Sequence, residues 1–141
     1  MMPADEAIQR LKEGNQRYAA GQSVNAITDV ETRRSLIGSQ RPFVAVLGCA
    51  DSRAIPELIF DAGIGELFVV RVAGNVINPQ NNGSLEYAVE HLDVSLIVVL
   101  GHQPERPTLR SRKRPATSTP SVVPPTCKTP HYWWIRHRSR S

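Results

Sequence analysis

The sequence predicts an α/β fold, in which a parallel β-sheet core is flanked by helices and followed by a disordered basic C-terminal tail. Short runs of β-branched and large apolar residues, typical of buried strands, occur at residues 43–47, 67–72 and 95–100. Segments with helical spacing of apolar residues lie between these runs, and this alternation favours parallel strands joined by right-handed crossovers. A chain of 141 residues is at most one domain and can bury a core.

Two helical segments are expected before the first strand. Residues 4–20 have the pattern of an amphipathic helix, because Ile8, Leu11 and Tyr18 fall on one side of it. A shorter helix is expected at residues 30–37, where a glycine follows.

The elements after the first strand alternate along the chain. Pro56 is typical of the first turn of a helix, which favours a helical turn over residues 55–60. The dipeptide Asn82-Gly83 is expected to break the chain, and residues 83–91 then predict a helix that leads into the third strand.

The chain changes character after His102. Residues 1–102 carry 8 Lys/Arg and 12 Asp/Glu, whereas residues 103–141 carry 9 and 1, with seven of the 11 prolines. The second part has no apolar periodicity, which favours a low-complexity, disordered segment. We therefore divide the chain into an α/β domain at residues 1–102 and a tail at residues 103–141.

Composition also restricts the location of the protein. The sequence contains no apolar run of 18 residues, so no membrane span is predicted. Residues 1–6 lack the basic and apolar regions of a signal peptide. Two cysteines allow one disulfide at most, and a reduced, cytoplasmic chain is expected.

Two of the predicted strands end in the same way. Val-Leu-Gly precedes Cys49 in the first strand and His102 in the third. Reactive groups in α/β proteins lie at the carboxyl ends of parallel strands, so these two side chains are expected at one edge of the sheet. A thiolate and an imidazole suit zinc, although a buried core cysteine and a structural histidine are the alternatives.

Asp51 and Arg53 follow directly and are close enough in sequence for a charge-assisted pair. The alternative is an ordinary surface ion pair, which contributes little. A cysteine-based phosphatase is excluded, because its loop needs Cys-x5-Arg and Ile55 stands at that position.

Several motifs together resemble the β-class carbonic anhydrases. They occur in the order of that family, from about residue 11 to residue 102, and cover the N-terminal two-fifths to half of the family domain. They are Cys49-x-Asp51-x-Arg53, Val-Val-Arg-Val-Ala-Gly-Asn at 69–75, Ser-Leu-Glu-Tyr-Ala-Val at 84–89, and Gly101-His102.

The resemblance implies zinc-dependent, reversible hydration of carbon dioxide to bicarbonate. It assigns Cys49 and His102 as zinc ligands and Gln40 as a residue that hydrogen-bonds the substrate. It implies that Asp51 accepts a hydrogen bond from the attacking hydroxide while Arg53 holds Asp51 off the metal. It also implies a second state, in which the Asp51–Arg53 pair is broken and Asp51 binds zinc. It also implies a homo-oligomer formed through the N-terminal helix.

The sequence departs from the family directly after His102. The family continues His-x-x-Cys, and Glu105 occupies the position of that last zinc ligand. A carboxylate can bind zinc, but Pro104 disfavours the helical turn that this spacing needs. Cys127 is 25 residues from His102, in the predicted tail. We therefore expect weak zinc binding and little turnover.

Two further readings stay open. The chain can be a catalytically inactive, truncated or frameshifted remnant of such an enzyme, since the motif breaks where the composition changes. It can also be a nucleic-acid binder acting through the basic tail and its Tyr-Trp-Trp cluster at 132–134. The second is not favoured, because scattered charges without a folded platform are more often a solvated run.

Overall fold

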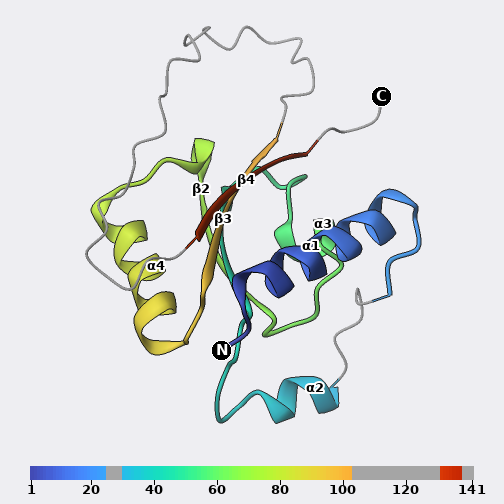
Figure 1. Cartoon of the computed structure of the whole chain (residues 1–141), viewed down its shortest axis with the longest axis horizontal. Helices are drawn as coiled ribbons and strands as arrows, with labels where there is room; N and C mark the ends of the chain where they lie inside the picture. Colours follow the sequence, from blue (N-terminus) through green and yellow to red (C-terminus); the bar gives the residue numbers. More distant parts are fainter. Residues whose placement is uncertain (25–29, 103–130, 138–141) are drawn as a thin grey trace, which may run out of the picture.

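The computed structural model describes residues 1–24, 30–102 and 131–137, which form a parallel sheet with helices on both faces (Figure 1). The strands lie in the order β2-β1-β3-β4, and every neighbouring pair is parallel. They are β1 (Val44–Cys49), β2 (Leu67–Val72), β3 (Leu96–His102) and β4 (His131–His137). The helices are α1 (Ala4–Ala19), α2 (Val30–Ser35), α3 (Pro56–Ile59), the 3-10 turn η1 (Ala73–Asn75) and α4 (Pro79–His91).

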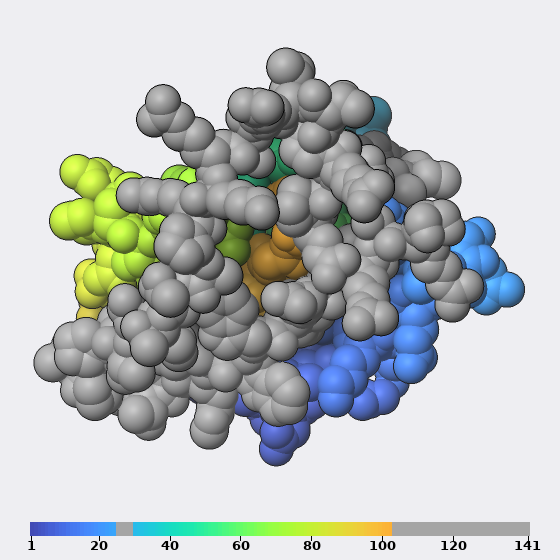
Figure 2. Space-filling model, turned by 90° about the horizontal axis from the view of Figure 1, so that it is seen from above, coloured from blue at the N-terminus to red at the C-terminus, as the bar shows by residue number. Residues whose placement is uncertain are grey.

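The two faces of the sheet pack against different helices. Alternate residues of β1 serve each face: Val44 and Val46 pack with residues of α1 and α3, whereas Ala45 and Leu47 pack with residues of α4. Figure 2 is seen from above, and the orange end of β3 lies between yellow-green residues on one side and blue ones on the other. Burial on both faces explains why the strands are continuous apolar runs rather than alternating ones.

Helix α1 is fastened to α3 by close backbone packing and by polar contacts. A Cβ atom at Gly14 would lie 1.8 Å from the carbonyl oxygen of Phe60, so only glycine fits there. Nearby, the buried carboxylate of Asp61 accepts hydrogen bonds from Arg17 Nε at 2.5 Å and from the backbone N–H of Val24 at 2.9 Å. These contacts pack the predicted N-terminal helix against α3 and the residues that follow it in the same chain.

The structure confirms the predicted parallel α/β core, and several boundaries differ from the prediction. Strands β1 and β3 extend to Cys49 and His102, so both candidate ligands are the last residues of their strands. Helix α4 begins at Pro79 rather than at residue 83, and the predicted break is wrong. The cause is a capping box: Asn78 and Asn81 bond each other's backbone N–H groups, and Pro79 takes the first helical position.

Strand β4 was not predicted. A segment without regular structure is expected at residues 103–141, yet His131–His137 pairs with β3 over seven residues. Aromatic and β-branched residues favour strands, and the edge of β3 provides backbone partners for them. The other residues of the tail lie outside the described residues. Among the described residues, no helix is long and apolar enough to cross a membrane.

Candidate metal centre

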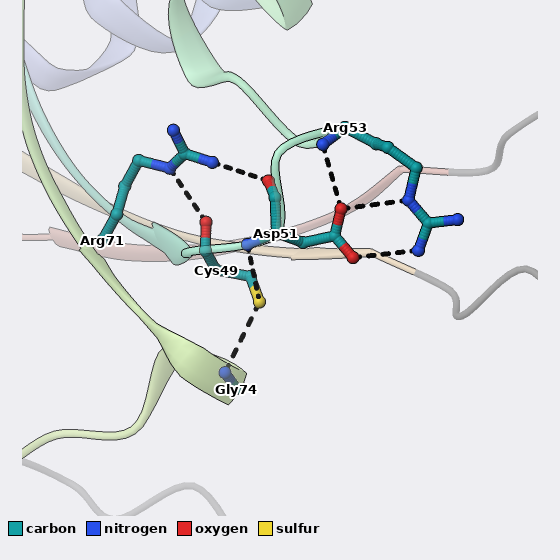
Figure 3. Close-up of polar contacts among 5 residues, drawn as sticks. All are labelled: Cys49, Asp51, Arg53, Arg71 and Gly74. Carbon is teal, nitrogen blue, oxygen red and sulfur yellow. Dashed lines mark hydrogen bonds and ion pairs between the residues drawn. The ribbon is translucent and has the colours of Figure 1, made fainter. Parts of the chain in front are cut away.

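Cys49 ends β1 in a half-buried position, where several hydrogen bonds converge on its sulfur. The backbone N–H groups of Asp51 and Gly74 donate to Sγ at 3.5 and 3.4 Å (Figure 3). The side chain of His102 also interacts with the sulfur and lowers its pKa. Burial raises the pKa of Cys49, but the hydrogen bonds from His102, Asp51 and Gly74 outweigh burial and leave it below the ordinary value. The sulfur is thus stabilised as the thiolate that binds metals.

Gly74 reaches the sulfur through its backbone conformation. Its φ of 73° lies in the left-handed region, which favours glycine, and it interrupts the short turn η1 directly after β2. Gly74 was quoted in the sequence only as part of a motif and was not recognised as a partner of Cys49. The signal for it was a glycine just past the end of a strand that neighbours β1.

Asp51 and Arg53 form the predicted pair. Oδ1 accepts from the backbone N–H of Arg53 at 2.9 Å and from Nε at 3.0 Å, and Oδ2 accepts from Nη2 at 2.9 Å. The side-chain hydrogen bonds from Arg53 hold the pKa of Asp51 well below its usual range, so Asp51 is ionised at any physiological pH. Of the two states expected for this pair, the structure has the one in which Arg53 holds the carboxylate of Asp51.

Arg71 holds the loop that carries both groups. From β2, its Nε donates to the carbonyl oxygen of Cys49 at 2.9 Å, and its Nη2 donates to that of Asp51 at 2.6 Å. Figure 3 shows the guanidinium lying across the two carbonyls, on the other side of the backbone from Gly74. Arg71 is not among the site residues predicted from the sequence, although a charged residue near the end of an apolar strand is a usable signal.

Gln40, the predicted substrate-binding residue, does not join this cluster. Gln40 is an exposed loop residue before the amino end of β1, whereas Cys49 lies at the carboxyl end. A strand of six residues separates the two ends by roughly 16 Å. Glu105 and Cys127 lie outside the described residues.

The cluster fits zinc in the kind of its donors but not in their number. Cys49 and His102 supply a thiolate and an imidazole that interact, both typical zinc ligands. A catalytic zinc site needs three protein ligands, and Asp51 is engaged by Arg53. Among the described side chains, no group of three His, Cys, Asp or Glu residues could hold a metal ion.

Comparison with known proteins agrees with this geometry. Residues 44–104 match the family described as Carbonic anhydrase. Over 96 residues the chain is 52% identical to Carbonic anhydrase of Mycolicibacterium smegmatis (strain ATCC 700084 / mc(2)155). This alignment covers 68% of this chain and 47% of the relative. The chain is 51% identical over 96 residues to Carbonic anhydrase 2 of Mycobacterium tuberculosis (strain ATCC 25618 / H37Rv), covering 68% and 46%.

Solved structures agree as well. The β-carbonic anhydrase CcaA superposes with a TM-score of 0.50 and 34% sequence identity, over 68% of this chain and 48% of CcaA. The chain therefore spans about half the length of the curated relatives it matches. The part that matches, which contains Cys49, Asp51, Arg53 and His102, belongs to the β-class carbonic anhydrase family.

Proposed function

We propose that this chain carries a carbonic anhydrase site, which catalyses the zinc-dependent, reversible hydration of carbon dioxide to bicarbonate. The observation that supports this most is that Cys49 and His102 end neighbouring parallel strands, where His102 lowers the pKa of the thiol, beside an Asp51 held by Arg53. The similarity to carbonic anhydrases covers this same stretch.

Each residue of the site has its own proposed role in the reaction. Cys49 and His102 would bind zinc, which when bound supplies the Lewis acidity that makes a water nucleophilic near neutral pH. Asp51 Oδ2 accepts a hydrogen bond from Arg53 Nη2 and has a further lone pair, with which it can accept a hydrogen bond from a nearby water and orient that water. Arg53, which holds the carboxylate of Asp51, would keep it from binding the metal.

The rate is expected to lie below that of full-length relatives. The chain spans about half their length, and the described side chains supply two zinc ligands where a catalytic site has three. The substrate-binding role of Gln40 and a homo-oligomer formed through α1 are parts of the proposal that follow from the family alone. A cytoplasmic location is proposed with them, because a reducing compartment keeps Cys49 available as a thiolate.

Replacement of each proposed ligand tests this function. We expect the zinc-loaded chain to accelerate carbon dioxide hydration above the buffer rate in a pH-indicator assay. Cys49→Ser and His102→Ala should abolish the acceleration. His91→Ala is the matched control, because His91 is an exposed histidine at the end of α4. A rate that survives Cys49→Ser, or that His91→Ala lowers equally, would refute the proposal.

A further inference from the structure

The turn that follows β2 reaches the sulfur of Cys49. The backbone N–H of Gly74 donates to Sγ at 3.4 Å, across 25 residues of sequence (Figure 3). The N–H of Asp51 also donates to Sγ, at 3.5 Å, but Asp51 belongs to the same loop as Cys49. Gly74 belongs to η1, so it holds the sulfur from the end of the neighbouring strand.

We propose that Gly74 is a positioning residue of the metal site, because its left-handed turn holds a backbone N–H against Sγ of Cys49 and so fixes the direction in which the sulfur faces a metal ion. This inference rests on the proposed function, in which Cys49 is a zinc ligand. A group that hydrogen-bonds a metal ligand orients it and tunes the metal, and losing such a group weakens metal affinity. Gly74 acts through Cys49 alone and is not a catalytic residue.

The backbone conformation of Gly74 explains why this position is a glycine. Its φ of 73° and ψ of 18° lie in the left-handed region, between the extended residues Val72 and Val76. A Cβ atom added to Gly74 would lie 4.0 Å from the side chain of Val76, an ordinary van der Waals distance, so a clash is not the constraint. The constraint is the backbone angle, which asparagine tolerates and β-branched residues rarely adopt.

Gly74 adds to the other contacts that β2 makes with the chain around Cys49. Arg71 donates to the carbonyl oxygen of Cys49. The carbonyl oxygen of Val72 accepts from the N–H of Ala50 at 3.1 Å. These two contacts fix the backbone, but they do not restrict rotation of the thiol about the Cα–Cβ bond. The hydrogen bond from Gly74 is directed at the sulfur itself and therefore restricts this rotation.

The zinc affinity of three full-length variants, measured by competition with a chelating dye, tests the proposal. Gly74→Val cannot keep a φ of 73° without strain, so it should move the N–H from the sulfur and weaken zinc binding about 10–100-fold. Gly74→Asn tolerates this angle and should bind zinc as the unmodified chain does.

Gly21→Val is the matched control. Gly21 has a φ of 70° just past the end of α1, and no atom of the described residues lies within 4 Å of a Cβ added there. Gly21→Val should therefore lose stability as Gly74→Val does, while keeping its zinc affinity. Urea unfolding compares the stabilities. Equal zinc affinities of Gly74→Val and Gly21→Val would overturn the proposal.

Amide hydrogen exchange in the metal-free chain tests the same contact even if Gly74→Val unfolds. In Cys49→Ala the N–H of Gly74 loses its acceptor, so its exchange rate should rise about 10-fold, the effect of losing one hydrogen bond. The N–H of Phe43, which donates to the carbonyl oxygen of Glu66 at 2.9 Å, is the internal control.

The exchange result separates this inference from the proposed function. An exchange rate at Gly74 that Cys49→Ala leaves unchanged would overturn the inference and leave the proposed function intact. A chain in which the exchange rate at Gly74 rises but which binds no zinc would refute the proposed function, and the positioning role with it.

Discussion

The guanidinium of Arg71 donates a hydrogen bond of 2.9 Å to the backbone carbonyl of Cys49, the residue that ends the neighbouring strand. Because the same group also bonds the carbonyl of Asp51, one planar side chain fixes two points of the loop against β2. The sulfur and the carboxylate of the candidate site are therefore positioned from their backbone side.

Arg71→Met should weaken zinc binding more than it destabilises the fold. We expect a loss of affinity of about 10–100-fold, the usual effect of removing a group that orients a ligand. The free energy of unfolding should fall by about 1–2 kcal/mol. Chelator competition and urea unfolding measure the two, with Arg41→Met at an exposed position as the control. Native zinc affinity in Arg71→Met would show that the loop holds its own conformation.

Arg53 determines the ionisation of Asp51. Arg53→Met should raise the pKa of Asp51 toward its ordinary value, because it removes the side-chain hydrogen bonds that lower it. In the unmodified chain, a carboxyl with a depressed pKa stabilises the fold above its unfolded pKa and loses this effect as the pH falls through its folded value. The pair should therefore stay intact between pH 5 and 8. Carbon-13 NMR titration of Asp51 measures this, and an unshifted pKa in Arg53→Met contradicts it.

Cys49 should react as a thiolate at lower pH than a free cysteine does. The hydrogen bonds from His102 and from the N–H groups of Asp51 and Gly74 lower its pKa against the effect of burial. Alkylation by iodoacetamide in metal-free Cys127→Ser protein, whose remaining cysteine is Cys49, gives the pKa directly. His102→Ala should shift the reactivity curve to higher pH. An identical curve would mean that His102 does not stabilise the thiolate.

Gly14 and Gly83 predict opposite effects of the same substitution. Gly14→Ala should destabilise the fold by about 3 kcal/mol or more, since its Cβ would overlap the carbonyl oxygen of Phe60. Gly83 lies in α4, and no atom lies within 4 Å of the Cβ that alanine would add there. Gly83→Ala should therefore stabilise the fold by about 0.5–1 kcal/mol. Urea unfolding compares them. Equal effects would contradict the docking of α1 on α3.

The candidate site was predictable from the sequence to the extent that it depends on local pattern. The shared Val-Leu-Gly before Cys49 and His102 sufficed to place both at one sheet edge, because parallel strands align their carboxyl ends. Arg71 and Gly74 were not predicted, since their contacts with Cys49 span 22 and 25 residues of sequence. The local signals, a charged residue near the end of an apolar strand and a glycine just past that strand, do not identify Cys49 as the partner.

The fold likewise has parts that local sequence patterns predict and parts that depend on long-range contacts. The apolar runs predicted β1, β2 and β3, whereas β4 was missed because its surroundings in the sequence are rich in proline and charge. A strand of this kind is specified by the edge it pairs with, and the pairing of His137 with His102 is a long-range feature. The start of α4 was missed for a local reason, since Asn81 acts as a cap rather than a breaker.

The dependence of carbon dioxide hydration on zinc occupancy tests the central claim most directly. The full chain is loaded with increasing zinc, and the hydration rate and the bound zinc are measured on the same samples. The account predicts a rate that rises in proportion to bound zinc and falls to the buffer value in Cys49→Ser. A rate independent of bound zinc, or fully loaded protein with no rate above buffer, would contradict it.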